Sequence, residues 1–478
     1  MTRTTKTGFV LLIAIVLVLG IWLLSRDTEA PTPSGEEVAQ PPVTGEWNLV
    51  AAAGPYRGKT IRLIGEDYAP LHAIEKLKSD FEDQTGIQVE VEGYEAEAVL
   101  EKVALDLASG AGRYDLVIQI YFDMGRLVEQ GQIRPLQPFL ENPALRNPDF
   151  QPENDLFPVW ETMGWYKGKA YGLPMMVLTM YTWYRKDLFE DASEKTAFQE
   201  RFGYELQPPA NWGQYRDIAE FFTRPADGLY GTLIQGKRHI ALWQEYINFL
   251  YSFGGTILET DDPSEYGPIA INSPQAIEAT EYYKNLLQFS PPDALNFTWD
   301  DALALMQQGK VALCLMWNDA TYALEDPEQS KVAGKMGYAL VPSGAAGVVQ
   351  QIGGQSYYIP TASKQPDAAY LFIQWMMSHE MQIRQQKLGG SSARRSTYED
   401  SEVLALPWMA TNIAALDSPH PAMLYTFPES LQIGEVLKSS ISGALAGERS
   451  VTQALDQAAL ELDRVLGDKA VLKYPPQP

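Results

Sequence analysis

From Gly58 onward, the chain alternates between the two hydrophobic periods that distinguish strands from helices. Short apolar or alternating runs predict strands at 60–64, 87–91 and 115–120. Between them, apolar residues recur at helical spacing: Ile74, Leu77 and Phe81 in one segment, and Leu100, Val103, Ala104 and Leu107 in the next. This β-α-β-α-β order predicts an α/β fold with an open parallel sheet, in which ligands gather at the carboxyl ends of the strands.

A second set of α/β elements follows in the second half of the chain. Asn272-Ser273-Pro274 predicts a helix start, because serine caps a helix and proline fits its first turn. The remaining patterns predict a helix at 303–308, a buried strand at 311–317, a strand at 356–359 after a break at Gly353-Gly354, and a helix through 369–376. Two α/β lobes with more than one crossing between them fit this order better than a linear string of domains.

Residues 165–189 lie between these two sets and are rich in tryptophan and tyrosine. Gly168 predicts a tight hairpin turn, and Pro174 is expected to end that unit. A strand-like apolar run at 176–184 then leads into a helix that opens at 185–187. The residues alone leave two interpretations open, a hinge strand beside a ligand cleft or an ordinary aromatic core strand.

The N-terminal residues have the pattern of a segment that enters a membrane. Arg3 and Lys6 precede an unbroken apolar run from Phe9 to Leu24, near the lower length limit of a spanning helix. No Ala-x-Ala cleavage site or lipid-accepting cysteine follows directly, so we expect residues 1–26 to be an uncleaved anchor, with a cleaved signal peptide as the alternative. The Pro, Thr and Glu residues that follow favour a flexible linker, placed at 27–57.

Composition narrows the classes of partner. The chain has 478 residues and a formal net charge of −24. This acidity argues against nucleic acid, because phosphates require a basic face, and it disfavours polyanionic ligands. The one cysteine, Cys314, lies in an apolar run and is expected to be a buried, inert thiol.

Several enzyme motifs begin in this sequence, but none is complete. Gly231 to Lys237 has the spacing of a phosphate-binding loop, yet Arg238 stands where Ser or Thr would ligate magnesium. His379-Glu380 begins a zinc-helix pattern in which Ile383 replaces the second histidine. We therefore expect no catalytic residue, no metal site and no cofactor, although a glycosidase carboxylate pair stays open among the many acidic residues.

Aromatic and hydrogen-bonding side chains at the predicted strand ends are the remaining candidates. Trp and Tyr faces can cover the apolar C–H face of a sugar, while carboxylates, amides and arginine bind its hydroxyls. A core role is the alternative for most of the aromatic residues. The candidates are Glu66 and Tyr68 after the first strand, Gln119, Tyr121 and Asp123 after the third, and Trp317, Asn318 and Asp319 after 311–317.

An ordered series of motifs supports a family resemblance over residues 58–467. In chain order they are LKSDFEDQTGIQVEV, SGAGRYDLVI, GKAYGLP followed by YRKDLF, INSPQAIEATEYYKNL, QQGKVALCLMW, SKVAGKMGYALVP, GGQSYYIP and ARRS at 393–396. The series resembles the extracellular solute-binding proteins of family 1, the sugar-binding type related to maltodextrin-binding proteins of ABC importers. Each motif alone is weak, whereas the ordered series is specific.

The resemblance implies a two-lobed periplasmic-binding-protein fold (type II) that closes about a hinge. It places the first lobe at 58–175 and 355–417 and the second at 176–354 and 418–478, with crossings near 172–178, 353–356 and 415–421. It also implies further ligand-binding candidates: Thr179 and Tyr181 past the first crossing, Trp243 in the second lobe, Gly354, where backbone can approach a ligand closely, and Arg394, which could donate two hydrogen bonds.

The function implied by the resemblance is that of an extracytoplasmic receptor. It would bind a sugar or oligosaccharide between its lobes and deliver it to the permease subunits of an ABC importer. We expect a periplasmic or other extracytoplasmic monomer, tethered to the inner membrane by its N-terminal segment. A sensing domain coupled to a membrane signalling protein, and a carbohydrate-active enzyme, stay open as alternatives.

Overall fold

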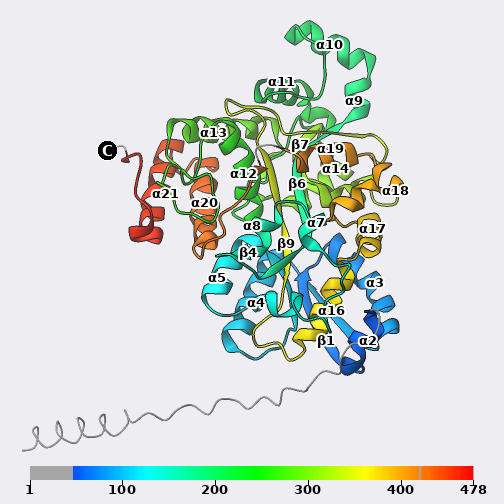
Figure 1. The fold of residues 1–478 in the computed structure, drawn as a ribbon. Helices are drawn as coiled ribbons and strands as arrows, with labels where there is room; N and C mark the ends of the chain where they lie inside the picture. Colours follow the sequence, from blue (N-terminus) through cyan, green and yellow to red (C-terminus); the bar gives the residue numbers. More distant parts are fainter. Residues whose placement is uncertain (1–46, 419–420, 477–478) are drawn as a thin grey trace, which may run out of the picture. The chain divides into compact units, whose positions relative to one another are not determined.

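A computed structural model describes residues 47–418 and 421–476, and within them one mixed sheet runs through two groups of helices (Figure 1). Its strand order is β2-β1-β3-β9-β6-β7, with β10 paired to β9 and β8 paired to β6. The strands are β1 (Thr60–Glu66), β2 (Gln88–Tyr94), β3 (Leu116–Ile120), β6 (Gly172–Arg185), β7 (Leu313–Trp317), β8 (Met336–Ala339), β9 (Gln350–Tyr358) and β10 (Pro421–Ala422). The predicted hairpin at Gly168 is confirmed as β4 (Trp165–Tyr166) and β5 (Lys169–Ala170).

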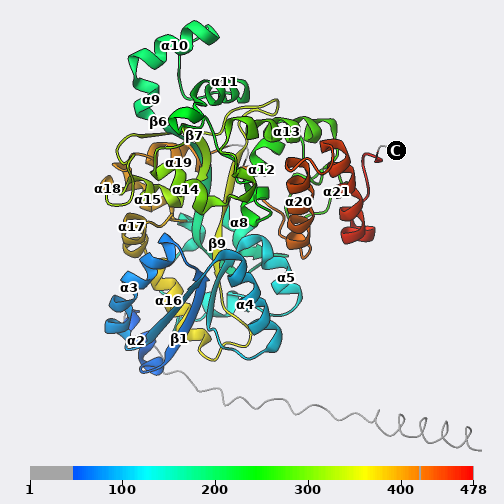
Figure 2. The same cartoon turned by 180° about the vertical axis from the view of Figure 1, so that it is seen from behind.

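The first lobe is built on β1, β2 and β3, which pair in parallel. Helices α3 (Ala69–Thr85) and α4 (Ala96–Ser109) cover opposite faces of these strands. Neighbouring residues of a strand point to opposite sides, so Leu63 packs in the cluster that contains α3 and Ile64 in the one that contains α4. In Figure 2, α16 (Pro366–Met376) lies on the α3 side, where it contacts both α3 and α2 (Leu49–Ala53).

The sheet is mixed, which corrects the prediction of an open parallel sheet. β9 runs antiparallel to β3 and to β6. The path of the chain explains this direction. β9 returns from the second lobe, so it enters the first lobe at the edge where β1 and β3 end.

Two long strands pass from one lobe into the other. The first half of β6, Gly172–Thr179, pairs with β9, and its second half pairs with β7 and β8. Pro174 therefore does not end a unit; it lies within β6 next to an irregularity in the register, where a missing N–H is tolerated. Gly353-Gly354 does not break the chain either, because both residues lie inside β9.

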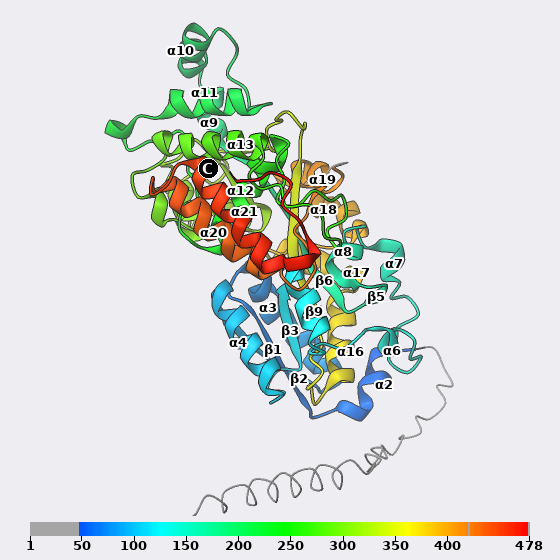
Figure 3. The same ribbon diagram turned by 90° about the vertical axis from the view of Figure 1, so that its left-hand side faces the viewer.

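The second lobe packs its helices around β7, β8 and the far half of β6. Figure 3 shows α12 (Ile240–Ser252), α13 (Pro274–Asn285), α20 (Ser430–Leu445) and α21 (Val451–Leu466) side by side, in agreement with their contacts. The predicted helix start is confirmed, since the Ser273 hydroxyl accepts a hydrogen bond from the Ala276 N–H at 3.2 Å. The other helices here are α9 (Lys186–Glu190), α10 (Ala192–Phe202), α11 (Trp212–Phe222), α14 (Trp299–Gln307) and α15 (Thr321–Glu325).

Shorter elements connect the lobes and cover their flanks. They are α5 (Met124–Glu129), α6 (Gln137–Leu140), α7 (Pro152–Asp155), α8 (Trp160–Gly164), α17 (His379–Lys387), α18 (Ser401–Leu404) and α19 (Met409–Leu416), with 3₁₀ turns η1 (Gly54–Tyr56), η2 (Tyr121–Asp123), η3 (Pro225–Asp227), η4 (Leu286–Phe289), η5 (Ala294–Asn296), η6 (Asn318–Ala320), η7 (Arg395–Glu399) and η8 (Gly467–Lys469).

The folded part of the chain begins before the predicted end of the linker. Residues 49–56 form α2 and η1, Ala53 is buried, and the Tyr56 hydroxyl donates to Asp367 Oδ2 at 2.7 Å. Packing against the first lobe thus fixes residues that the sequence assigned to a flexible tether. The predicted anchor at 1–26 lies outside the described residues, among which no helix is both long and apolar enough to cross a membrane.

Candidate functional site

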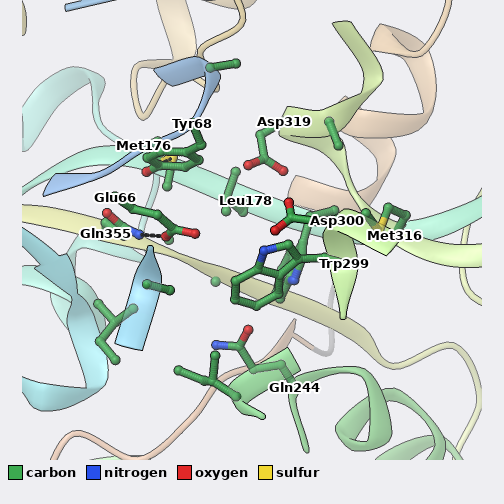
Figure 4. Close-up of a pocket in the computed structure, with 18 of the residues that line it drawn as sticks. Glu66, Tyr68, Met176, Leu178, Gln244, Trp299, Asp300, Met316, Asp319 and Gln355 are labelled. Carbon is green, nitrogen blue, oxygen red and sulfur yellow. Dashed lines mark hydrogen bonds between the residues drawn. The ribbon is translucent and has the colours of Figure 1, made fainter. Parts of the chain in front are cut away.

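A cavity of about 370 Å³ lies between the two lobes (Figure 4). Its wall is formed by the ends of β1 and β7, the middle of β6 and β9, and the first residues of α3, α4, α12 and α14. The polar and aromatic residues of the wall are Glu66, Asp67, Tyr68, Glu95, Tyr121, Phe122, Gln244, Trp299, Asp300, Trp317, Asp319, Gln351 and Gln355. Both lobes and both crossing strands therefore contribute to one site.

The first-lobe wall is held by hydrogen bonds between side chains. Glu66, the last residue of β1, accepts from Gln355 Nε2 at 2.7 Å. Tyr68 precedes α3, and its hydroxyl donates to Met176 Sδ at 3.1 Å. Figure 4 shows the Glu66 carboxylate directed into the cavity beside Gln355. These bonds tie the end of β1 to both crossing strands.

The second-lobe wall comes from α14 and from the end of β7. Trp299 and Asp300 are the first residues of α14, whose start is fixed by a capping box between Thr298 and Asp301. Figure 4 shows the Trp299 ring extending into the cavity, with the Asp300 and Asp319 carboxylates above it. Trp317 ends β7 and packs against Gly353, where an added Cβ would lie 2.9 Å from Trp317 Cη2.

Burial makes Glu66, Asp300 and Asp319 weaker acids than usual. Burial, reinforced by the negative charge of Asp319, raises the pKa of Glu66 to about 8 even though Gln355 donates to it. Burial also raises the pKa of Asp319 to about 6. The pKa of Asp300 is raised as well, by burial and by the neighbouring charge of Asp301. A part of this wall thus carries protons near neutral pH.

The raised pKa of Glu66 predicts a dependence of stability on pH. The folded protein binds this proton more tightly than the unfolded chain, in which the pKa is near 4.5. The contribution of Glu66 to stability is therefore complete below about pH 4.5 and is lost as the pH rises through 8. We expect Glu66→Gln to stabilise the ligand-free protein by several kcal/mol, up to about 5, at pH 9 and to change little at pH 4.

Urea unfolding of the wild type and Glu66→Gln across this pH range measures the difference. Glu281→Gln, on the exposed face of α13, is the control and should follow the wild type. If the free energy of unfolding differed between the wild type and Glu66→Gln by the same amount at every pH, the assignment of a protonated Glu66 would be contradicted.

Two side-chain pairs join the lobes at the first turn of α4. Glu95 caps α4 and also interacts with His239 Nε2 at 3.0 Å, while His239 caps α12 through Nδ1. In the same first turn, Lys438 of α20 donates to Glu97 Oε1 at 2.8 Å. The Lys438 side chain is 10% exposed and the Glu97 side chain 38% exposed, so solvent screens this cross-lobe ion pair only in part.

We expect Lys438→Met to shift the protein toward an open arrangement of the lobes. The methionine retains most of the buried stem but loses the bond to Glu97, along with an ion pair to Glu435 within α20, so ligand affinity should fall about three- to ten-fold. Small-angle scattering without ligand and calorimetric titration with ligand measure the two effects. Lys469→Met removes an ion pair to Glu429 within the second lobe and serves as the control, for which neither quantity should change.

The structure brings six of the sequence-predicted site residues to the cavity wall: Glu66, Tyr68, Tyr121, Trp317, Asp319 and Gly354. Their role in ligand binding stays a prediction. Gly354 has a φ of +143°, and an added Cβ would lie 2.3 Å from the Met176 carbonyl oxygen. It serves first to let β6 and β9 approach each other closely.

Seven others do not line the cavity: Gln119, Asp123, Thr179, Tyr181, Trp243, Asn318 and Arg394. Their polar groups are mostly used within the fold. Asn318 Nδ2 donates to Asn412 and Ser391, and its Oδ1 accepts from the Thr179 N–H. Arg394 donates to Asp155 Oδ2 at 2.6 Å and to the Met377 carbonyl, so its guanidinium is used outside the cavity wall.

The other four are placed by similar constraints. Gln119 donates to Asp123, which also accepts two hydrogen bonds from Arg126. Tyr181 is fully buried with its ring against Tyr338. Trp243 packs against Gly434 and against Phe122, so it lies behind a cavity residue and does not line the cavity itself.

Sequence reasoning missed Trp299, Asp300, Gln244, Glu95, Met176, Met316 and Gln355, all of which line the cavity. A signal was available for Trp299 and Asp300. Thr298 and Asp301 have the spacing of a capping box, which sets the helix start at Trp299 rather than at Leu303. A tryptophan in the first turn of a helix, where backbone N–H groups are free, is a candidate for a ligand site.

Comparison with known proteins is consistent with this architecture. The model of the family described as bacterial extracellular solute-binding protein matches residues 67–383. A mannitol-binding protein of Pseudomonas aeruginosa is 27% identical over 390 residues, which cover 76% of this chain and 83% of that protein.

Two solved structures are similar throughout the folded part. A solute-binding protein of an ABC transporter from Agrobacterium radiobacter K84, in complex with ribitol, is 25% identical with a TM-score of 0.77, covering 86% of this chain and 99% of that one. Another from Thermotoga lettingae, bound with α-D-tagatose, is 25% identical with a TM-score of 0.73, covering 86% and 100%. The two-lobed periplasmic-binding-protein fold is shared by all three chains.

Proposed function

We propose a sugar-receptor function for this chain, which belongs to the family of bacterial extracellular solute-binding proteins. It binds a sugar or sugar alcohol between its lobes and presents it to the permease subunits of an ABC importer. The observation that carries this proposal is the cavity between the lobes, whose wall combines aromatic rings with carboxylate and amide groups. The similar proteins that bind mannitol, ribitol and tagatose support the ligand class.

The chemistry of the wall fits a polyhydroxylated ligand. The Trp299 face can cover the C–H groups of a sugar or polyol, and Glu66, Asp300 and Asp319 can accept from its hydroxyls. Ligand sites range from about 300 to 1,000 Å³, and a cavity of about 370 Å³ is at the small end of that range. We therefore favour a monosaccharide or a polyol over a long oligosaccharide.

The mechanism is closure of the lobes around the ligand. A ligand that contacts Glu66 on one side and Trp299 on the other binds the closed arrangement better than an open one, and so shifts the population toward it. We place the hinge in β6 and β9, with the first lobe at 58–175 and 355–417 and the second at 176–354 and 418–478. The importer then distinguishes the closed, loaded receptor from the open one.

The family and the similar proteins are binding proteins, and we propose no catalytic step for this chain. We further propose that it acts as an extracytoplasmic monomer, tethered by the apolar run Phe9–Leu24. Membrane fractionation, with mass spectrometry of the mature N-terminus, tests the tether. Recovery of a soluble form cleaved after this run would reject it.

A thermal-shift screen against neutral sugars and sugar alcohols, followed by calorimetry of the hits, tests the receptor function. Mannitol, sorbitol, ribitol, tagatose, glucose and maltose form the initial panel. We expect at least one to raise the melting temperature, to bind with a stoichiometry of about one and to remain chemically unchanged. No shift with any sugar or polyol, or turnover of the bound one, would reject the proposal.

A further inference from the structure

We propose that the cognate ligand carries a positive charge, as an amino sugar or amino polyol whose ammonium group lies among Glu66, Asp300 and Asp319. The inference rests on the proposed function of the cavity and narrows its ligand class. It follows from the charge of the wall, from the pairing of its carboxylates and from the acceptors that the fold leaves open.

The cavity wall has charges of one sign. Five carboxylate side chains line it: Glu66, Asp67, Glu95, Asp300 and Asp319. Among the described residues, no lysine, arginine or histidine lines it. A sugar acid or a sugar phosphate is usually bound by cationic side chains. Five carboxylates and no cationic side chain therefore disfavour an anion here, even though α3, α4, α12 and α14 begin at this wall.

Two of these carboxylates already have a partner outside the wall. Asp67 pairs with His72 at 2.7 Å, and Glu95 pairs with His239 at 3.0 Å. The other three, Glu66, Asp300 and Asp319, form no ion pair with any described residue. They come from both lobes, and Figure 4 shows their carboxylates around one common space. That space is where a cation from outside the chain would be neutralised from several sides.

An unpaired carboxylate in a partly buried wall is costly, and the protein has two ways to relieve the cost. The carboxylate can hold a proton, and the raised pKa values of Glu66 and Asp319 show that burial drives the ligand-free site in this direction. Alternatively, a bound ammonium can compensate the charge and release the protons. The second route supplies binding energy that a neutral hydroxyl cannot.

Other groups in the cavity also favour a donor-rich, cationic ligand. Gln355 is 6% exposed and donates its amide nitrogen to Glu66, so this donor is not free for a ligand. The Trp299 ring offers a π face next to the carboxylates, and such a face attracts ammonium groups. Acceptors thus outnumber donors at the point where both lobes meet the ligand.

Ligands that share a carbon skeleton but differ in charge test the inference. The first series is glucamine (1-amino-1-deoxysorbitol), sorbitol and gluconate, and the second is glucosamine, glucose and glucuronate. Calorimetry at pH 7.5 and low salt should show the amine binding about ten-fold tighter than the neutral member, or more, in at least one series, with no detectable binding of the acid. The preference for the amine should shrink as salt is added.

The possible results separate this inference from the receptor function. If neutral sugars or polyols bind but neither amine is tighter than its neutral counterpart, the charge inference is rejected and the receptor function stands. Tightest binding of an acid likewise rejects the charge inference alone. If no member of either series and no sugar of the initial panel binds, both proposals fail.

Variants of the cavity carboxylates test which side chains bind the ammonium group. Asp300→Asn and Asp319→Asn keep the size of the side chain and remove its charge, so each should reduce the ratio of amine to neutral affinity several-fold. Asp293→Asn, at an exposed position of the second lobe outside the cavity, should leave that ratio as in the wild type. An unchanged ratio in both cavity variants would place the ammonium elsewhere and overturn the assignment.

Discussion

Replacing Trp299 by alanine is expected to weaken binding of the best-bound sugar or polyol by about 30-fold, or ~2 kcal/mol. The ring extends from the first turn of α14 into the cavity, where its face can cover the C–H groups of a ligand. Trp299 is half-buried without ligand and its ring packs edge-on against His239, so its loss should cost the fold less than the loss of a fully buried tryptophan. Calorimetric titration gives the affinity, and urea unfolding gives the stability, which should change by less than about 1 kcal/mol.

Two other tryptophans make this result interpretable. Trp165→Ala removes a half-buried ring from the β4–β5 hairpin outside the cavity and should leave affinity unchanged. Trp317→Ala should lower both affinity and stability, because Trp317 is 7% exposed and packs against Gly353. Equal affinity of Trp299→Ala and the wild type would show that the ligand does not use this ring.

The strand ends of the site could be predicted from the sequence because local patterns determine them. Glu66 and Tyr68 follow an alternating strand, and Trp317 and Asp319 follow a continuous apolar one, so their place at the carboxyl ends needs no tertiary information. Trp299 could not be placed in the same way. It reaches the cavity only because the crossing strands bring α14 opposite the end of β1, more than 200 residues earlier in the chain.

For polar residues near a strand end, the sequence does not show whether the side chain faces a ligand or is used within the fold. Asn318 sits between two cavity residues, Trp317 and Asp319, yet its amide is used to join β6, α19 and the loop at Ser391. Arg394 has the residue type expected of a ligand-binding arginine, but it neutralises Asp155 inside the first lobe. A sequence gives the donors and acceptors, whereas the fold decides which of them remain free for a ligand.

The crossing strands were also the part of the fold that sequence signals described least well. Proline and paired glycines usually end or break regular structure, which is why Pro174 and Gly353-Gly354 predicted boundaries. Here they lie within β6 and β9, where the two strands pass from lobe to lobe. The same residues let β6 and β9 approach each other closely and allow the irregular register at Pro174. The residues that usually break regular structure therefore lie in the region that we propose as the hinge.

Gly354→Ala tests that close approach, and we expect it to lower the free energy of unfolding by about 3 kcal/mol or more. The methyl group would lie 2.3 Å from the Met176 carbonyl oxygen, a backbone atom that cannot move without separating β6 from β9, and the φ of +143° is strained for alanine. Urea unfolding measures the loss.

A second glycine separates the steric effect from the conformational one. Gly203, which ends α10, also has a positive φ, +82°, but an added Cβ would meet no atom within 4 Å. Gly203→Ala should therefore cost only about 1 kcal/mol, the price of the left-handed backbone alone. The excess loss in Gly354→Ala then measures how tightly the crossing strands are packed. If the two variants lose the same stability, β6 and β9 have room to separate at Gly354, and a hinge that depends on their close contact cannot be correct.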